Sequence, residues 1–198
     1  SLGHKVIQIP NAIDISSLSF DEDRKYEKQV IFAGRLSKEK GIRTLIEICK
    51  NIPNDIHIII IGDGPEVENI KKLESSQNNI HYLGSKNHQQ TISLIKGSDV
   101  LVQPSFSEGI STTILESMAC KTVIVASNVG GNLELIQDQE SGILVEPTNP
   151  EIFCEKIIKL TSDKLFRNKL SDLSYENVKK YDWKNIGKQY LELYNSLL

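Results

Sequence analysis

Two carboxylates flank a short glycine-containing turn in the second half of the sequence, at Glu108 and Glu116. Gly109 lets the backbone bend tightly after the first of them, and Ser111, Thr112 and Thr113 offer hydroxyls and a cap for a helix that begins there. The first N–H groups of a helix lack internal partners, so such a turn attracts anions. Ionised carboxylates accept hydrogen bonds and can each hold a pair of vicinal hydroxyls. The segment therefore indicates a ligand with sugar hydroxyls at both ends and phosphate between them; taken alone, an ordinary capped helix with solvated glutamates is the alternative.

A second candidate is the basic loop of residues 34–41, which follows an apolar run and precedes an amphipathic stretch. Arg35 could donate a fork of hydrogen bonds to a diphosphate, and Lys40 could add a point charge. A solvated basic loop is the alternative for this segment in isolation. Its spacing is not that of a P-loop, and residues 62–65 lack the third glycine of a dinucleotide-binding fingerprint.

The histidines and cysteines do not form a catalytic or metal-binding pattern, since both kinds are scattered along the chain. Two histidines, His57 and His81, fall within or beside predicted strands, where a partnered structural role is expected. His88, on a predicted rim loop, could touch a ligand, and a surface role is the expectation. The three thiols lack the spacing of a metal site or a disulfide scaffold and are expected to be reduced and mostly buried, as in a cytoplasmic protein; they are Cys49, Cys120 and Cys154.

Composition and charge narrow the function classes. The 198 residues are 39% hydrophobic and 25% charged, which is typical of a soluble globular protein. A formal net charge of -3 argues against a general nucleic-acid binder. No apolar run has the length of a membrane span, and the start lacks the zones of a signal peptide. Because the chain begins without methionine and enters an apolar, strand-like piece at residues 5–10, we expect it to be part of a longer protein.

The elements that must position the candidate residues alternate between apolar runs and amphipathic stretches. The isoleucine-rich run of residues 56–61, interrupted only by His57, predicts a strand buried on both faces, and Pro65 is placed as a first helical residue. Strands are predicted at residues 30–33, 56–61, 80–83, 100–103, 122–126 and 142–145, and helices at 41–50, 66–75, 89–96, 112–120, 132–137, 151–160, 164–180 and 183–197. This order predicts an α/β fold in a single domain spanning residues 1–198: a Rossmann-like, doubly wound parallel sheet with helices on both faces and a helical C-terminal extension. Ligands bind beyond the carboxyl ends of such strands, so the loops at 34–35, 62–63, 83–85 and 104–109 should share one rim.

The order of these pieces resembles a known family. The stretches that carry the resemblance are residues 30–41, 60–66, 82–84, 98–105, the Glu108 and Glu116 pair, and 126–136. Together they resemble the carboxy-terminal, donor-binding half of retaining GT-B glycosyltransferases, specifically glycosyltransferase family 4. The resemblance covers nearly the whole chain, including residues 9–14 and 181–183.

The resemblance implies a role for each candidate residue in holding a nucleotide-diphosphate sugar. Arg35 and Lys40, next to Gly34, would hold the phosphates and offset the charge on the leaving group. Glu108 would bind the transferred sugar, and Glu116 the ribose. The residues that would face the diphosphate and sugar through their amides or a hydroxyl are Gly109, Ile110, Ser111 and Thr112; those near the nucleobase are Ser85, Lys86 and Asn87. Relatives need no metal or other cofactor, and the two cations would supply the positive charge.

The sequence differs from the usual pattern of this family at several positions. Lys121 and Val123 stand where relatives commonly have glycine and proline, and Ser111 where many have glycine or proline. The amino-terminal domain that binds the acceptor, and through which the full enzyme could contact a membrane peripherally, is absent, so we expect the chain alone to bind donor weakly and transfer nothing. The expected parent is a cytoplasmic hexosyltransferase of polysaccharide or glycolipid synthesis. The alternatives are a regulatory module that senses nucleotide sugar, or another GT-B class such as a nucleotide-sugar epimerase or a glycogen phosphorylase relative.

Overall fold

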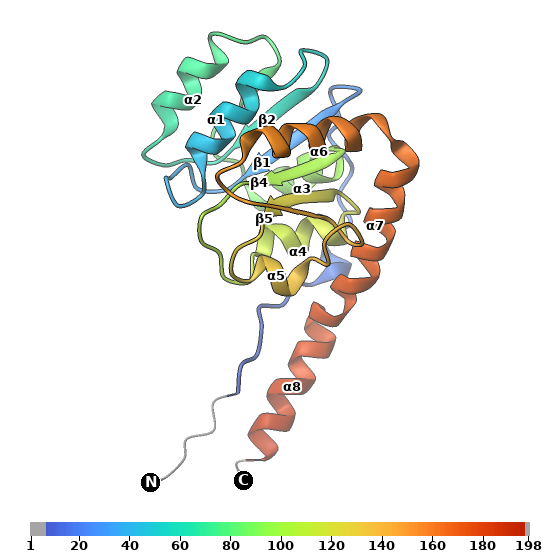
Figure 1. The fold of residues 1–198 in the computed structure, drawn as a ribbon. Coiled ribbons are helices and arrows are strands. Elements are labelled where there is room, and N and C mark those ends of the chain that lie inside the picture. Colours follow the sequence, from blue (N-terminus) through green and yellow to red (C-terminus); the bar gives the residue numbers. More distant parts are fainter. Residues whose placement is uncertain (1–6, 197–198) are drawn as a thin grey trace.

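Six parallel strands form the centre of the computed structural model, which describes residues 7–196. The order across the sheet is β3-β2-β1-β4-β5-β6 (Figure 1). The chain adds β2 and β3 on one side of β1, then crosses back to place β4, β5 and β6 on the other side. The strands are β1 (Gln29–Ala33), β2 (His57–Ile61), β3 (Ile80–Tyr82), β4 (Val100–Gln103), β5 (Val123–Ser127) and β6 (Ile143–Val145). The sequence predicted all six strands and the doubly wound, Rossmann-like arrangement, and the structure confirms them.

The strands are apolar throughout because both faces of the sheet are covered. In β1, Val30 and Phe32 point into one core, and Ile31 and Ala33 into the other. Its register sets Val30 opposite Ile58 of β2 on one side and opposite Val100 of β4 on the other. β1 and β4 are therefore neighbours at the point where the strand order reverses.

Helices cover the two faces in separate groups. The core on one face includes residues of α1 (Ile42–Asn51), α2 (Val67–Glu74) and α6 (Pro150–Ser162), and the core on the other includes residues of α3 (His88–Lys96), α4 (Thr112–Ala119) and the single turn α5 (Asn132–Leu135). Figure 1 shows α6 lying over the sheet beside α1, with α4 and α5 on the opposite side. The long helix α7 (Lys164–Val178) runs down the edge and contributes Leu170 to the first core and Val178 to the second.

A last helix, α8 (Trp183–Asn195), extends away from this body (Figure 1). The 3-10 turn Lys179–Tyr181 leads into it, and backbone hydrogen bonds tie its start to residue 13: Ile13 N–H donates to the Tyr181 carbonyl at 3.0 Å, and Trp183 N–H to the Ile13 carbonyl at 2.9 Å. Ile186 is buried, whereas Trp183, Leu191 and Tyr194 are more than half exposed. Within residues 7–196, no helix is both long and apolar enough to cross a membrane.

The local structure differs from the prediction at the start of α2 and at residues 7–10, and the turn at Lys121 has an unusual backbone conformation. Pro65 lies in a turn, and α2 begins two residues later at Val67, because Glu66 has a non-helical φ of -94° and ψ of 8° and the Val67 N–H closes a tight turn onto the Gly64 carbonyl. The strand expected at residues 5–10 does not form at 7–10, and residues 5 and 6 lie outside the described part. Lys121, where relatives commonly have glycine, adopts a left-handed φ of 59° after α4. The N–H of Lys121 donates to the Met118 carbonyl and that of Thr122 to the Ser117 carbonyl, so the lysine completes a Schellman turn.

The cysteines carry no disulfide. Cys49 and Cys154 are buried and Cys120 is partly buried, as expected. Burial raises the pKa of the Cys120 thiol to about 11 and that of Cys154 to about 11. These thiols are therefore protonated and unreactive at neutral pH.

Candidate functional site

The loops at the carboxyl ends of five strands are joined into one rim by backbone hydrogen bonds. Gly62 N–H donates to the Gly84 carbonyl at 3.0 Å, which links the loops after β2 and β3. Leu36 N–H donates to the Asp63 carbonyl at 2.8 Å, Phe106 N–H to the Glu39 carbonyl at 2.8 Å, and Gly131 N–H to the Glu108 carbonyl at 3.0 Å. The loops after β1, β2, β3, β4 and β5 are thus connected in the order of the strands, and the rim predicted from the sequence is confirmed.

Two glycines allow this close contact. Gly41 has a φ of +70°, and a Cβ there would lie 1.8 Å from the Pro104 carbonyl oxygen. Gly130 has a φ of +47°, and a Cβ there would lie 2.0 Å from the Glu108 carbonyl oxygen. Any side chain at either position would push a neighbouring rim loop away.

Lys40 and Glu108 meet across the gap between β1 and β4. The Lys40 ammonium lies 2.8 Å from each carboxylate oxygen of Glu108. The Glu108 side chain is only 5% exposed, whereas that of Lys40 is 32% exposed. The pair places one cation and one buried acceptor side by side where the strand order reverses, which is where doubly wound sheets bind their ligands.

The amino end of α4 lies next to this pair. Ser111 is the N-cap, and its hydroxyl accepts a hydrogen bond from the N–H of Ile114 at 3.4 Å. The Ile110 carbonyl accepts from the Asn11 amide at 2.8 Å. The cap predicted from the sequence is thereby confirmed at Ser111, and Gly109 and Thr112 are exposed to solvent.

Glu116 lies farther along α4, where it contacts α3. Its Oε1 is 2.8 Å from Nε2 of His88, and the two side chains are 16% and 59% exposed, respectively. Asn87, just before His88, caps α3 by accepting from the N–H of Gln90 at 2.9 Å. The loop expected to contact the nucleobase is therefore held beside the glutamate expected to contact the ribose.

A pocket of about 230 Å³ opens between these elements. Its floor is the end of β1 and β2, and its walls come from the loop after β3 and from the first turns of α3 and α4. The lining residues are Ala33, Gly34, Ile61, Gly62, Ser85, Lys86, Thr91 and Thr113. The lining combines apolar and small residues at the floor with hydroxyls and one lysine at the wall, a mixture that is typical of ligand sites.

The structure brings the predicted site residues to one end of the sheet in two groups. Gly34, Ser85 and Lys86 line the pocket, whereas Lys40 and Glu108 form their ion pair outside the pocket lining. Arg35 lies on the rim with an exposed side chain. Gln103, whose amide contacts Glu108, and Thr91 were not among the residues predicted from the sequence. Thr113 was predicted as a hydroxyl at the start of the helix, and His88 as a surface residue that could touch a ligand. The one available signal for Gln103 was its position at the end of a predicted strand, just before the glutamate segment.

The other two described histidines have the structural role expected of them. His57 Nδ1 and His81 Nε2 are 3.0 Å apart on neighbouring strands, and the ring of Tyr26 stacks on His57 with 3.9 Å between centroids. Burial, together with the neighbouring His57, lowers the pKa of His81. His4 lies outside the described residues.

Comparison with known proteins agrees with this geometry. Residues 15–177 match the family Glycosyl transferases group 1. An uncharacterized glycosyltransferase of Methanocaldococcus jannaschii is 30% identical over 91% of this chain and 50% of its own length. The N,N'-diacetylbacillosaminyl-diphospho-undecaprenol alpha-1,3-N-acetylgalactosaminyltransferase of Campylobacter jejuni is 27% identical over 85% of this chain and 45% of its own length.

Solved structures share the fold. Anabaena Alr3699/HepE in complex with UDP-glucose superposes with a TM-score of 0.83 at 21% identity, covering 95% of this chain and 57% of that one. The C-terminal domain of a glycosyl transferase group 1 family protein from Francisella tularensis superposes with a TM-score of 0.75 at 27% identity, covering 86% of this chain and 98% of that one. The chain spans about half the length of the curated relatives it matches. It belongs to the family Glycosyl transferases group 1 and has the fold of the carboxy-terminal half of a GT-B glycosyltransferase.

Proposed function

We propose that this chain is the donor-binding domain of a retaining glycosyltransferase of family 4, which transfers a hexose-type sugar from a nucleotide diphosphate to a glycan or glycolipid. The observation that carries the proposal is the Lys40–Glu108 pair, at 2.8 Å, beside the first turn of α4 and at the reversal of strand order. A cation, a helix amino end and a buried carboxylate suit a ligand that carries a diphosphate and a sugar.

In this proposal, the diphosphate lies along the amino end of α4. Arg35 and Lys40 face it from the loop after β1, and the amides of Gly109, Ile110 and Ser111 and the hydroxyl of Thr112 face it from the loop after β4. These groups stabilise the charge that develops when the bond between the anomeric carbon and the phosphate oxygen breaks. The electron pair of that bond leaves with the nucleoside diphosphate, and the acceptor hydroxyl oxygen joins the anomeric carbon while its proton passes to the departing phosphate oxygen. The positive charge comes from side chains, so the proposed reaction needs no metal ion.

In the same proposal, the two glutamates bind different parts of the ligand. Glu108 accepts hydrogen bonds from the transferred sugar, and neither glutamate acts as a general base. Glu116 accepts from the ribose, and because His88 contacts only its Oε1, the second oxygen remains for a hydroxyl. The nucleobase lies near Ser85, Lys86 and Asn87, at the open side of the pocket.

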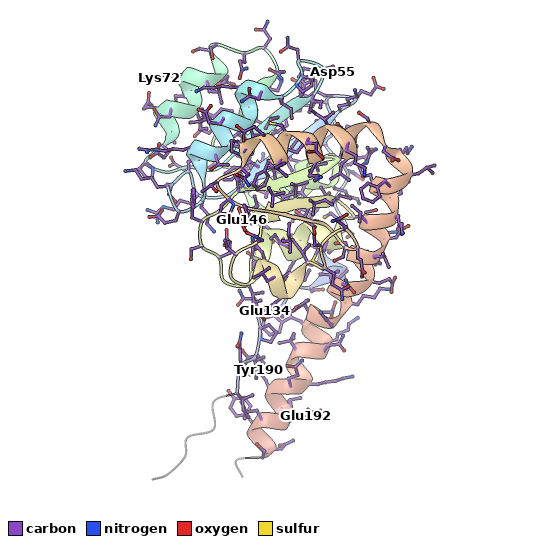
Figure 2. The ribbon with its side chains drawn as sticks, viewed as in Figure 1. Asp55, Lys72, Glu134, Glu146, Tyr190 and Glu192 are labelled. Atoms are coloured by element: carbon purple, nitrogen blue, oxygen red, sulfur yellow. The ribbon has the colours of Figure 1, made fainter. Side chains whose placement is uncertain are left out.

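The acceptor site is proposed to lie in an amino-terminal domain of the parent protein. The half-length match to relatives supports this, and so does the exposed face of α8. Figure 2 shows Tyr190 and Glu192 on the part of α8 that extends beyond the body. Tyr194 on the same helix is 62% exposed and Leu191 64%, so this helix offers apolar side chains to a neighbouring domain. Any peripheral membrane contact would come through that domain, and three free thiols suit a cytoplasmic location.

Titration calorimetry with UDP, GDP and ADP tests the proposal. We expect one of the three to bind this chain with a Kd in the micromolar to millimolar range, and Lys40→Ala and Glu116→Ala each to weaken it about tenfold or more, as loss of a hydrogen bond to a charged group does. Lys38→Ala is the matched control, because Lys38 is an exposed cation of the same loop. Absence of binding at millimolar concentration, or equal affinities of the Lys40→Ala and Lys38→Ala variants, would overturn the assignment. Sugar transfer by this chain alone would contradict the separate acceptor domain.

A further inference from the structure

Gln103, the last residue of β4, lies directly behind the Lys40–Glu108 pair. Its side chain is buried, with the whole residue 5% exposed. Its amide nitrogen donates to Oε1 of Glu108 at 2.5 Å and to the hydroxyl of Ser111 at 3.2 Å. The Ser111 hydroxyl also lies 3.4 Å from Oε1 of Gln103. One amide thus connects the end of a central strand, the buried glutamate and the N-cap of α4.

The two donors to Glu108 differ in what else they can do. Lys40 is a flexible, charged side chain that is 32% exposed, and in the proposed function it also faces the diphosphate. An ammonium that turns toward a phosphate gives up part of its contact with the carboxylate. Gln103 carries no charge, so a diphosphate does not attract it strongly, and its backbone is fixed in the sheet next to Ala126 of β5.

The burial of Glu108 makes such a fixed donor necessary. A carboxylate that is 5% exposed loses most of its hydration and must be compensated by hydrogen bonds. If Lys40 were its sole partner, the carboxylate would follow the ammonium or turn toward solvent when donor binds. Gln103 contacts Oε1 from the end of β4, whereas the partner of Oε2 is the Lys40 ammonium at 2.8 Å. When Lys40 turns toward a diphosphate, Gln103 keeps the carboxylate in place and Oε2 becomes available to a ligand hydroxyl.

We propose that Gln103 is a positioning residue for the sugar half of the donor. It keeps the Glu108 carboxylate in place to accept hydrogen bonds from hydroxyls of the transferred hexose while Lys40 contacts the diphosphate. This inference rests on the proposed function and adds to it the residue that makes the site selective for nucleotide sugar over free nucleotide.

The test compares two affinities in each variant: that for the nucleoside diphosphate the chain prefers among UDP, GDP and ADP, and that for its glucose conjugate. Gln103→Met retains the length of the side chain but cannot donate. We expect it to bind the free nucleotide within about twofold of the original chain and the glucose conjugate about tenfold more weakly, the loss of one hydrogen bond to a charged group. Adding Glu108→Gln to Gln103→Met should then have little further effect, because both changes remove the same contact with the sugar.

Asn128→Leu is the matched control. Asn128 follows the neighbouring strand β5, and its amide donates to Glu146 Oε1 at 2.6 Å, an amide–carboxylate contact at the same end of the sheet. Figure 2 labels Glu146 in this region. We expect both affinities to be unchanged in this variant. If Gln103→Met fails to fold, Gln103→Asn, whose amide is one methylene too short to reach Glu108, takes its place.

The outcomes separate the two proposals. If the original chain binds nucleotide and conjugate, and the ratio of the two affinities is the same in the Gln103 variants, the inference is wrong and the proposed function stands. If Gln103 variants lose both affinities equally, the residue has a structural role only. If the original chain binds none of the three nucleotides or their conjugates, the proposed function is wrong, and the inference about Gln103, which rests on it, is wrong as well.

Discussion

Each end of β4 has a buried carboxylate held by cations, but the two clusters are built differently. At the amino end, Asp99 is 5% exposed in its side chain and contacts Arg24 at 2.9 Å and Arg167 at 3.2 Å. It also accepts from the backbone N–H of Gln29 at 3.1 Å. At the carboxyl end, Glu108 is equally buried but contacts one lysine and one amide.

The partners of Asp99 are fully engaged with the protein. Arg24 also donates to the carbonyls of Gly97 and Glu27, and Arg167 to the carbonyl of Leu160. Guanidinium groups with several fixed acceptors hold one geometry. This cluster therefore fastens the segment before β1, the start of β4 and the helix α7 to one another.

The proposed ligand site is not at the larger of the two cavities. A space of about 490 Å³ lies beside Asp99, lined by charged residues that include Lys28 and Lys164, and it is larger than the pocket of about 230 Å³ at the other end. The difference lies in the hydrogen-bonding groups: at the Asp99 end each guanidinium also donates to a backbone carbonyl, whereas at the Glu108 end the contacts of the Lys40 ammonium are with the two oxygens of Glu108, beside the amino end of α4.

The largest expected effect is on the free energy of unfolding, and it follows from removing the carboxylate of Asp99. Asp99→Ala leaves two guanidinium groups near a buried site without their acceptor, so we expect the free energy of unfolding to fall by about 3–5 kcal/mol. Urea denaturation measures the change. Asp172→Ala, which removes an exposed partner of Lys121, should cost less than about 1 kcal/mol. If the free energy of unfolding fell by similar amounts in the two variants, the Asp99 cluster would not have the structural role assigned to it.

The next effect is on binding and concerns Arg35. This exposed arginine is predicted to contact the diphosphate, so Arg35→Ala should weaken nucleoside diphosphate binding about tenfold or more while changing the unfolding free energy by less than about 0.5 kcal/mol. Calorimetry and urea denaturation measure the two quantities. Arg43→Ala, at an exposed position of α1, is the control and should change neither. If Arg35→Ala lowered the free energy of unfolding without weakening binding, Arg35 would have a structural role and the assignment of ligand contacts to the carboxyl end of the sheet would be wrong.

A smaller effect is expected from the histidine pair, which lies away from the rim. The pKa of His81 is lowered in the folded state, so the unfolded chain binds more protons as the pH falls below the ordinary value of about 6.5. The contribution of this residue to stability is therefore present at pH 7.5 and declines on acidification from about 6.5 toward the lowered folded pKa. His81→Phe keeps a ring beneath Tyr26 and removes the titration. Urea denaturation at pH 7.5 and 5.5 should show a smaller stability difference in His81→Phe than in the original chain; an equal difference would contradict the assignment.

The smallest effect is expected at Lys121. A side chain with a Cβ is strained at its φ of 59°, so Lys121→Gly should unfold at a higher Tm than Lys121→Ala, by about 2–4 °C for a chain of this size. Thermal unfolding followed by circular dichroism measures the order. Both variants lose the contact with Asp172, so this contact does not affect the comparison. Nucleotide affinity should be the same in both, and a lower Tm for the glycine variant would contradict the strain.

The sequence predicted the elements well because the signals for them are local. The isoleucine run at residues 57–61 and the amphipathic stretch of α1 each identify their element without help from distant residues. Once strands and helices alternate, the parallel sheet and the shared rim follow from chain geometry. The starting point of α2 was misplaced by two residues because Pro65 and Glu66 lie in a tight turn, closed by the Val67 N–H to the Gly64 carbonyl, before the helix begins.

Side-chain partners were not predictable in the same way. Lys40 and Glu108 are 68 residues apart, and they meet only because β4 lies next to β1 in the sheet. The sequence placed both at one ligand without showing that they contact each other. Arg24 and Asp99, 75 residues apart, were missed altogether. Such contacts depend on strand order and on the direction of each side chain, neither of which the pattern of residue types specifies.

The backbone hydrogen bonds that join the rim loops have a consequence for redesign of the donor specificity. Main-chain atoms make these links, so exposed side chains at the tips, such as those of Ser85 and Lys86, can be exchanged for others without breaking them. Loop length is different, because inserting or deleting one residue in the loop after β1 would move the Glu39 carbonyl away from Phe106 and the Leu36 N–H away from Asp63. A graft of one loop from a relative with another loop length should therefore fail, whereas a graft of neighbouring loops together should keep their mutual register.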